Sequence, residues 1–228
     1  MNTRRWIALL AVAFAGPIFT SAQSAAATPA ARTIVLVRHG AYDTAAPRSA
    51  DGPGLVPLGI AQARLTAARL RTLPQLPKHI IVSSMLRARQ TAAVFHETLP
   101  EVPVEATDAL RECTPRTSNA MGATALEASI ACEKRLDAAF TGYFIPAADG
   151  AETDVLVCHG NVIRYFVMKA LGVDATHWLQ MSVAHTSVTV IRVEADGRPH
   201  LLSVGDVGHL PPNMQSGIDE RDPQLVAP

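Results

Sequence analysis

The sequence predicts an α/β fold, a three-layer α/β/α sandwich with a mostly parallel central sheet. Apolar runs over 33–37 and 154–158 have the nearly unbroken pattern of strands that are buried on both faces. Such strands alternate along the chain with segments whose apolar residues recur at helical spacing, which favours a parallel sheet covered by helices. The chain has 228 residues, 48% of them hydrophobic, which is enough for one globular domain with its own core.

The first half of the chain gives clear local signals for its elements. After the first strand, a helix is expected over 58–73, where apolar side chains recur every three to four residues until Pro74 ends the pattern. A short apolar strand over 78–82 leads directly into a helix over 85–99. This is the alternation of strand and helix that builds parallel sheets.

The second half continues this alternation and ends in a hairpin. The remaining expected elements are extended pieces at 102–104 and 109–110, helices over 123–144 and 161–171, and strands over 187–193 and 201–204. Asn161 stands near the N-cap of the second of these helices. Asp196-Gly197 lies between the last two strands and is typical of a hairpin turn.

The N-terminal segment is typical of a targeting sequence. A pair of arginines precedes an apolar run over 6–19, and small residues follow it. The run is short for a membrane span and is interrupted by Gly16-Pro17. We therefore expect a cleaved signal peptide over 1–26, a linker over 27–32, and a secreted or periplasmic domain without stable membrane association. An uncleaved membrane anchor is the alternative.

Charge and cysteine content exclude several classes of partner. Lys plus Arg number 20 and so do Asp plus Glu, so no overall field favours nucleic acid, and no nucleic-acid partner is expected. The three cysteines are Cys113, Cys132 and Cys158, and neither they nor the histidines have metal-ligand spacing. We expect no metal and no cofactor.

A histidine followed by glycine ends two of the predicted buried strands, at His39-Gly40 and His159-Gly160. The carboxyl ends of strands in open α/β sheets are where ligands bind. The helix that begins near Asn161 would also direct free backbone N–H groups at an anion. Either histidine alone is more commonly a loop or core residue, but the repeated placement indicates an anion site.

Four motifs in a fixed order resemble those of the histidine phosphatase superfamily, in its phosphoglycerate-mutase-like branch. They are Arg38-His39-Gly40, the segment from Ser83 to Ala92, Leu110-Arg111-Glu112, and Cys158-His159-Gly160-Asn161. Further segments, at 55–59, 158–165 and 205–212, resemble the mitochondrial Ser/Thr protein phosphatases of that branch. The resemblance implies a phosphoglycerate-mutase-like domain over 33–215 with a C-terminal tail over 216–228.

The resemblance implies a metal-independent phosphomonoester hydrolase that works through a phosphohistidine. His39 would be the nucleophile, because a neutral imidazole nitrogen can attack phosphorus. Glu112 would protonate the leaving alcohol and later deprotonate the attacking water. Arg38 and Arg87 would stabilise the phosphate oxygens, with His159 as a further donor. The expected substrate-binding residues are Arg38, Arg87, His159 and Asn161.

A second arginine competes with Arg87 for this role. Arg89 lies two residues further along the expected helix, which corresponds to about 200° of rotation, so both side chains cannot face one phosphate. Because Ala88 and Thr91 have the spacing of the family motif, the resemblance selects Arg87.

Alternative functions remain open. The chain could be a phosphate-binding or interaction module on the same fold, because fold alone does not imply chemistry. A phosphoglycerate-type mutase is the enzymatic alternative, although the loop over 42–55 is short for sealing out water. The phosphorylated substrate is either a protein or a small phosphoester. A homo-oligomer is also open, because the segment at 205–212 resembles one that packs against a partner subunit.

Four residues near the proposed site carry separate hypotheses. Cys113 and Cys158 each adjoin a proposed catalytic residue, so a disulfide between them that modulates activity is one hypothesis, and two buried thiols are the alternative. Cys132 is expected to be a core residue. His185 lies where the family often places an Asn or a His near the pocket, although a structural turn residue is the favoured expectation. Tyr42 packs either on the substrate or at the edge of the core.

Overall fold

The computed structural model describes residues 28–47, 49–117 and 122–218. Its strands are β1 (Arg32–Arg38), β2 (His79–Ser83), β3 (Val104–Thr107), β4 (Glu152–Cys158), β5 (Val188–Val193) and β6 (Pro199–Asp206). Its α-helices are α1 (Pro57–Arg71), α2 (Leu86–Thr98), α3 (Ala123–Tyr143) and α4 (Gly160–Leu171). Short 3₁₀ helices are η1 (Asp108–Leu110), η2 (Ala175–Gln180) and η3 (Pro212–Met214). The predicted signal peptide over 1–26 lies outside the described residues.

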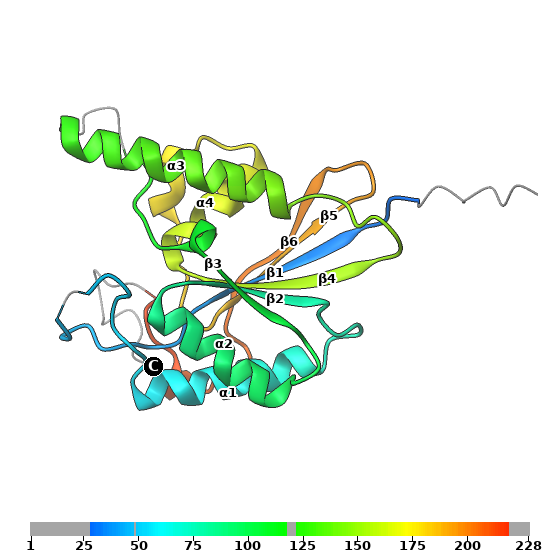
Figure 1. Ribbon diagram of the computed structural model, residues 1–228, viewed down its shortest axis with the longest axis horizontal. Coiled ribbons are helices and arrows are strands. Elements are labelled where there is room, and N and C mark those ends of the chain that lie inside the picture. Colours follow the sequence, from blue (N-terminus) through cyan, green and yellow to red (C-terminus); the bar gives the residue numbers. More distant parts are fainter. Residues whose placement is uncertain (1–27, 48, 118–121, 219–228) are drawn as a thin grey trace, which may run out of the picture.

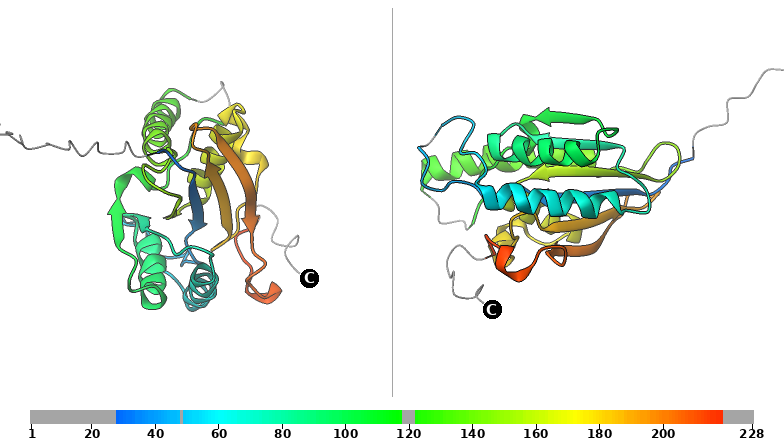
Figure 2. Two further views of the ribbon diagram at one scale, coloured as in Figure 1. Left: turned by 90° about the vertical axis from the view of Figure 1, so that its right-hand side faces the viewer. Right: turned by 90° about the horizontal axis from the view of Figure 1, so that it is seen from below.

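The six strands form one mixed sheet in the order β3-β2-β4-β1-β5-β6. The pairs β3–β2, β2–β4 and β4–β1 are parallel, whereas β5 and β6 add antiparallel strands at one side. Helices α1 and α2 cover one face and α3 and α4 the other (Figures 1 and 2). The predicted three-layer α/β/α fold is therefore confirmed.

The central strands have apolar middle segments because both of their faces are buried there. In β1, Ile34 and Leu36 point into the core under α3 and α4, while Val35 and Val37 point into the core under α1 and α2. All four side chains are at most 1% exposed. Because side chains alternate between the two faces of a strand, one apolar run contributes to the core on each side of the sheet.

The register of β1 and β4 determines where the site forms. Arg38 lies opposite Cys158 at the ends of these parallel strands, and the backbone N–H of His39 donates to the carbonyl of Cys158 at 3.0 Å. The two histidines that follow the strands are therefore neighbours, although they are far apart in sequence.

Two local expectations are corrected by the structure. Residues 109–110 are not extended but belong to η1, because the Thr107 side chain accepts a hydrogen bond from the Ala109 backbone at 3.1 Å and caps that turn. Helix α4 begins at Gly160 with His159 as its N-cap, so Asn161 lies inside the first turn. The Asn161 side chain bonds to the neighbouring loop instead of capping the helix.

The hypothesis of a Cys113–Cys158 disulfide is wrong, and of the two buried thiols expected as its alternative only Cys158 is one. Cys113 forms a disulfide with Cys132 of α3, with the two Cα atoms 5.8 Å apart, and Cys158 is a buried free thiol. Cys158 is the last residue of β4 and is enclosed in the core under α4, whereas the segment that follows Glu112 runs toward α3. Cys132 is also 4% exposed, as expected of a core residue.

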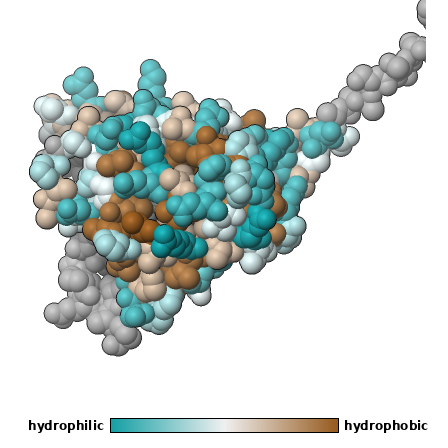
Figure 3. All heavy atoms as spheres, turned by 60° about the horizontal axis from the view of Figure 1, so that its bottom comes forward, coloured by the Kyte–Doolittle hydropathy of each residue, from teal (hydrophilic) through white to brown (hydrophobic). Residues whose placement is uncertain are grey.

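Within residues 28–47, 49–117 and 122–218, none of the helices is both long and apolar enough to cross a bilayer. On the face turned forward in Figure 3, apolar patches are separated by hydrophilic residues. Interspersed surfaces of this kind are common in proteins.

Candidate active site

The site begins with two histidine rings at the carboxyl end of the parallel strands. His39 follows β1 and His159 follows β4, and their ring centroids lie 5.0 Å apart. Both are buried, with 2% and 0% of their surface exposed. Burial lowers the pKa of both rings well below 6.5, and the neighbouring cations Arg38 and Arg87 lower it further. Both imidazoles are therefore neutral at pH 7.

The hydrogen bonds of His39 fix its tautomer. Its Nδ1 lies 2.8 Å from the carbonyl oxygen of Gly40, which can only accept, so Nδ1 carries the proton. The other nitrogen, Nε2, accepts a hydrogen bond of 2.9 Å from Nε of Arg87. The lone pair of Nε2 therefore faces the arginine side of the site, in the orientation that a nucleophile requires.

Two arginines flank this nitrogen. Nη1 of Arg38 donates to the carbonyl oxygens of Val183 and Gly217 at 2.6 Å and 2.8 Å. Arg87 lies in the first turn of α2, and its guanidinium carbon lies 4.9 Å from the centroid of the Tyr42 ring. The competing Arg89 instead lies 3.4 Å from Asp51 and is half-exposed. The structure thus brings Arg87 and not Arg89 to His39.

His159 connects the histidine pair to Glu112. Its Nε2 lies 2.8 Å from Oγ of Ser83, and its Nδ1 lies 3.4 Å from Oε2 of Glu112. The backbone N–H of Asn161 donates to the other carboxylate oxygen of Glu112 at 3.3 Å. The carboxylate is therefore held between the second histidine and the first turn of α4.

Asn161 is engaged with protein groups on both ends of its amide. Nδ2 donates to the carbonyl oxygen of Cys113 at 3.1 Å, and Oδ1 accepts from Nη1 of Arg164 at 3.3 Å. Asn161 also lines the cavity described below. Its side chain therefore positions the loop after Glu112 and an arginine of α4.

These side chains surround a cavity of about 210 Å³. The residues that line it are Arg38, His39, Tyr42, Arg87, Glu112, Gly160, Asn161 and Arg164. Among these described residues three arginines stand against one carboxylate, so the cavity favours an anionic ligand. His159 lies behind His39 and reaches the site through Glu112. In the part of the chain that the structure describes, no three His, Cys, Asp or Glu side chains gather as metal ligands would.

Two glycines allow the loop that carries His39 to approach α1 closely. A Cβ atom on Gly40 would lie 2.5 Å from the carbonyl oxygen of Gly59, and one on Gly59 would lie 2.0 Å from the carbonyl oxygen of Ala41. Either distance is too short for real atoms, so both positions require glycine. The close contact fixes the loop that carries His39.

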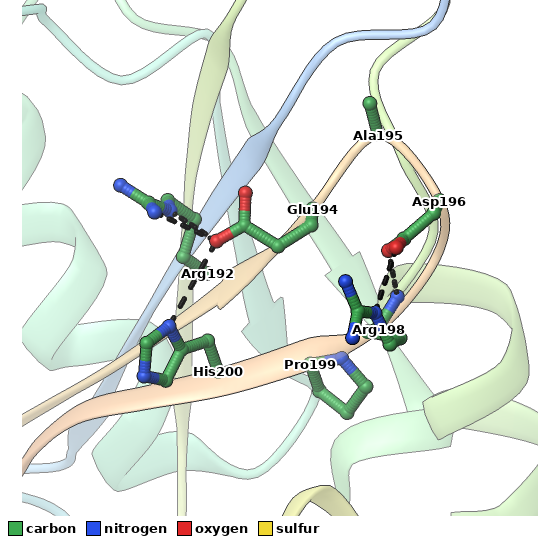
Figure 4. A pocket seen from close by; sticks show the side chains of 7 residues that line it. All are labelled: Arg192, Glu194, Ala195, Asp196, Arg198, Pro199 and His200. Carbon is green, nitrogen blue, oxygen red and sulfur yellow. Dashed lines mark hydrogen bonds and ion pairs between the residues drawn. The ribbon is translucent and has the colours of Figure 1, made fainter.

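A larger hollow elsewhere does not offer comparable chemistry. It lies beside the β5–β6 hairpin, with a volume of about 700 Å³, and Figure 4 shows the side chains that line it. Arg192 pairs with Glu194 at 2.7 Å and Arg198 with Asp196 at 2.7 Å. These charges along the hollow therefore neutralise one another. Because Val193 lies opposite Arg32 at the start of β1, this hollow is at the other end of the sheet from His39.

Comparison with known proteins agrees with this geometry. A family model for the histidine phosphatase superfamily (branch 1) matches residues 34–127 and 114–207. The chain belongs to the histidine phosphatase superfamily. This histidine phosphatase is 34% identical over 193 residues to the mitochondrial serine/threonine-protein phosphatase PGAM5 of Xenopus tropicalis, covering 82% of this chain and 69% of that protein. The protein of the same name from Homo sapiens is 36% identical over 190 residues, which cover 81% of this chain and 65% of the relative.

The fold has solved relatives as well. A phosphoglycerate mutase of Plasmodium falciparum matches 80% of this histidine phosphatase and 95% of its own chain, with 26% identity and a TM-score of 0.56. The resemblance that the sequence motifs indicated is thereby confirmed, and so is the prediction of a phosphatase. The chain spans about two thirds of the length of the two phosphatases named above.

The predicted localisation is corrected by these relatives. Secretion or a periplasmic location was expected from the first 26 residues, whereas the similar phosphatases are named as mitochondrial proteins. A segment with arginines, serines and no acidic residues also has the composition of a mitochondrial leader, so composition does not discriminate between the two destinations.

Sequence reasoning missed two parts of the histidine phosphatase site. His185, expected to be a structural turn residue, lies with its ring centroid 5.5 Å from that of His39 and 5.8 Å from that of Tyr42. Ser216 and Gly217 fall in the predicted tail, yet Ser216 Oγ lies 2.9 Å from Nδ1 of His185 and Gly217 bonds Arg38. No spacing in the sequence signals these contacts. Tyr42, which was expected to pack either on the substrate or at the edge of the core, lines the cavity.

Proposed function

We propose that the protein hydrolyses phosphoserine and phosphothreonine side chains of proteins, without a metal ion, through phosphorylation of His39. The observation that carries the proposal is the lone pair of His39 Nε2, which is directed at Arg87 in a cavity lined by arginines. The choice of a protein substrate is supported by the relatives at 34% and 36% identity, which are serine/threonine-protein phosphatases.

The first step transfers the phosphoryl group to the protein. On binding, the substrate phosphate takes the N–H groups of Arg38 and Arg87, so that Arg87 Nε–H moves from His39 Nε2 to a phosphate oxygen. Nε2 then attacks phosphorus, the bond between phosphorus and the ester oxygen breaks, and protonated Glu112 gives its proton to that oxygen. The product alcohol leaves with a neutral hydroxyl group.

The second step returns the enzyme to its first state. A water molecule attacks the phosphorus of phospho-His39, Glu112 accepts its proton, and the bond between phosphorus and Nε2 breaks. Inorganic phosphate then leaves. The hydrogen bond from Nδ1 to the Gly40 carbonyl persists throughout and compensates the positive charge that develops on the ring. In both steps the arginines stabilise the charge on the transferring oxygens.

Glu112 is positioned for its role by its neighbours rather than by depth of burial, since its side chain is 25% exposed. It lies between Nδ1 of His159 and the backbone N–H of Asn161. We assign Asn161 a positioning role, because both ends of its amide bond protein groups.

The test uses p-nitrophenyl phosphate and phosphopeptides in the presence of EDTA. Wild type should hydrolyse p-nitrophenyl phosphate, and His39→Ala should lower kcat by about three orders of magnitude or more. His96→Ala removes an exposed histidine of α2 and is the matched control, which should retain wild-type activity. Dependence on a metal, or an active His39→Ala protein, contradicts the mechanism.

The substrate class is decided in a second set of assays. Phosphoserine and phosphothreonine peptides should be better substrates than sugar phosphates by kcat/KM. The reverse order would favour small phosphoesters. Transfer of phosphate from a bisphosphoglycerate to a phosphoglycerate, in place of release to water, would favour a mutase. Binding of phosphate without any turnover would favour a binding module.

A further inference from the structure

Glu112 differs from the other proposed catalytic residues in how its backbone is held. His39 and His159 directly follow β1 and β4, and Arg87 lies in α2, so regular secondary structure fixes their backbones. Glu112 instead lies in the segment 111–117, which contains neither helix nor strand and begins where η1 ends. Its position therefore depends on the contacts that this segment makes with the rest of the protein.

Helix α3 holds this segment through the side chains of Arg135 and Glu133. Arg135 donates from Nη1 to the Asp108 carbonyl at 2.7 Å and from Nη2 to the Arg111 carbonyl at 2.9 Å. The Glu133 carboxylate accepts from the backbone N–H and from Nε of Arg116, at 2.9 Å and 2.8 Å. The Arg116 side chain is 41% exposed, and surface ion pairs of this kind contribute little because water competes for both groups.

A covalent bond adds a stronger anchor directly beside Glu112. Cys113, the next residue, is bonded to Cys132 of α3. Cys132 is 4% exposed and belongs to the same core as Leu110 and Leu136, so packing fixes its end of the bond. Because adjacent Cα atoms are only about 3.8 Å apart, the disulfide restrains the backbone that carries the Glu112 carboxyl.

The contacts of the Glu112 carboxylate itself are long. Oε2 lies 3.4 Å from Nδ1 of His159, and Oε1 accepts from the Asn161 backbone N–H at 3.3 Å. Most N–H···O hydrogen bonds in proteins measure about 2.9–3.0 Å, so these two contacts hold the carboxylate weakly. The carboxyl therefore follows its backbone. A misplacement of about 1 Å at a reacting group can lower a rate about a hundredfold.

We propose that the Cys113–Cys132 disulfide is a positioning element that keeps the Glu112 carboxyl at the ester oxygen of the substrate. The proposal rests on the function proposed above, in which Glu112 protonates the leaving alcohol. Opening the bond should leave the attack by His39 in place, because His39 is held by β1. It should slow the departure of those leaving groups that need a proton.

Two substrates that differ in one substituent isolate this step. Phenyl phosphate releases phenol, whose pKa is about 10 as in tyrosine, so a proton from an acid aids its departure. p-Nitrophenyl phosphate releases an anion whose charge is delocalised into the nitro group and which departs without a proton. The readout is the ratio of kcat/KM for phenyl phosphate to kcat/KM for p-nitrophenyl phosphate, here called the leaving-group ratio. Since kcat/KM covers the steps up to phosphorylation of His39, the later hydrolysis does not enter it.

The experiment measures the leaving-group ratio with and without the bond. Cys113→Ser/Cys132→Ser should lower it about tenfold, and Glu112→Gln, which removes the acid itself, about a hundredfold. Wild type reduced with dithiothreitol should match the double variant. In that reduction one thiolate of the reagent attacks a sulfur of the pair, and its second thiol displaces the mixed disulfide. Cys113 and Cys132 thereby take up two electrons and two protons, and the reagent becomes a cyclic disulfide.

Two controls separate positioning from a general loss of structure. Dithiothreitol should not change the ratio of the double variant, in which the remaining cysteine, Cys158, is a buried thiol. Leu70→Ala removes packing from the core under α1 and α2, on the other face of the sheet from α3. This variant is destabilised as well but should keep the wild-type ratio.

The outcomes distinguish this proposal from the function on which it rests. An unchanged ratio in the double variant, or in wild type whose open bond is verified by thiol titration, would overturn the positioning role and leave the proposed function intact. An equal decrease of the ratio in Leu70→Ala would also overturn the positioning role. A Glu112→Gln protein with the wild-type ratio would refute Glu112 as the acid and, with it, this proposal.

Discussion

Oγ of Ser83 lies 2.8 Å from Nε2 of His159, and both residues are fully buried. Ser83 ends β2 and His159 follows β4, so the parallel pairing of these strands brings the two together. Oγ of Ser83 also accepts a hydrogen bond from the Met85 backbone at 3.4 Å, which leaves the hydroxyl proton to donate to Nε2. Nδ1 of His159 then carries the ring proton and points to Glu112.

Replacing this hydroxyl should therefore impair catalysis more than folding. We expect Ser83→Ala to lower kcat on p-nitrophenyl phosphate about five- to tenfold, because His159 loses the hydrogen bond that sets its tautomer. Ser84→Ala is the control, since the Ser84 hydroxyl bonds Asp108 and Arg111 outside the histidine cluster. An equal effect of both changes on kcat would contradict this role.

Stability should decrease below pH 6.5. Burial, followed by neighbouring charges, lowers the pKa of His39 and His159 well below 6.5 and that of His185 to about 3. In the unfolded chain each histidine binds a proton near pH 6.5, so the unfolded state then holds more protons than the folded state. The free energy of unfolding should fall with decreasing pH by up to about 1.4 kcal/mol per pH unit for each histidine.

Urea unfolding between about pH 7.5 and pH 5.5 measures this dependence. His185→Asn should make it shallower by roughly a quarter, because it removes one of four histidines whose pKa is lowered, the fourth being His209. His96→Asn, which removes an exposed histidine, should match wild type. A free energy of unfolding that increases as the pH falls would contradict this prediction.

The Cys113–Cys132 disulfide should contribute strongly to stability. It joins residues 19 apart and ties the segment after Glu112 to α3. Cys113→Ser/Cys132→Ser should lower the free energy of unfolding by roughly 2–4 kcal/mol, and dithiothreitol should bring wild type to the same value. Thiol titration should detect Cys158 only after unfolding, because burial raises its pKa to about 12. Three reactive thiols after unfolding without reductant, in place of one, would exclude the bond.

Two glycine-to-alanine substitutions should change the stability of the fold in opposite directions. Gly59→Ala places a Cβ atom 2.0 Å from the carbonyl oxygen of Ala41 and should destabilise the fold by about 3 kcal/mol. Gly142 lies in α3, and a Cβ atom there would meet open space among the described residues. Gly142→Ala should therefore stabilise by roughly 0.5–1 kcal/mol. Thermal unfolding of both variants measures these changes. Equal shifts of the unfolding midpoint temperature would contradict the packing argument.

The sequence was most informative where a local pattern determines a local structure. The apolar run of β1 and the later run of β4 predicted two buried strands, and the histidine after each one then had to lie at the same edge of the sheet. The helical rotation between Arg87 and Arg89 likewise showed that both cannot face one phosphate, and the resemblance to the family motif then selected Arg87, which bonds His39. The placement of the histidines needed only periodicity and the direction of the strands, whereas the choice of arginine also needed the motif.

Contacts made by distant turns were beyond such reasoning. His185 reaches His39 because β5 pairs with β1, where the Thr186 backbone N–H donates to the Arg38 carbonyl at 3.0 Å. Periodicity does not tell which strand becomes the neighbour of β1. The partner of Cys113 was missed for a related reason, since adjacency to catalytic residues in sequence says nothing about the direction in which Cys158 points from its strand.

The hydrogen bond from Arg38 to the Gly217 carbonyl joins residues that are 179 positions apart in the chain. A ribosome that adds about 5–20 residues per second needs roughly 10 to 40 s to pass from one to the other. Arg38 is thus synthesised well before the Gly217 carbonyl that holds its side chain. The observed arrangement of Arg38 can therefore form only after Gly217 has been added to the growing chain.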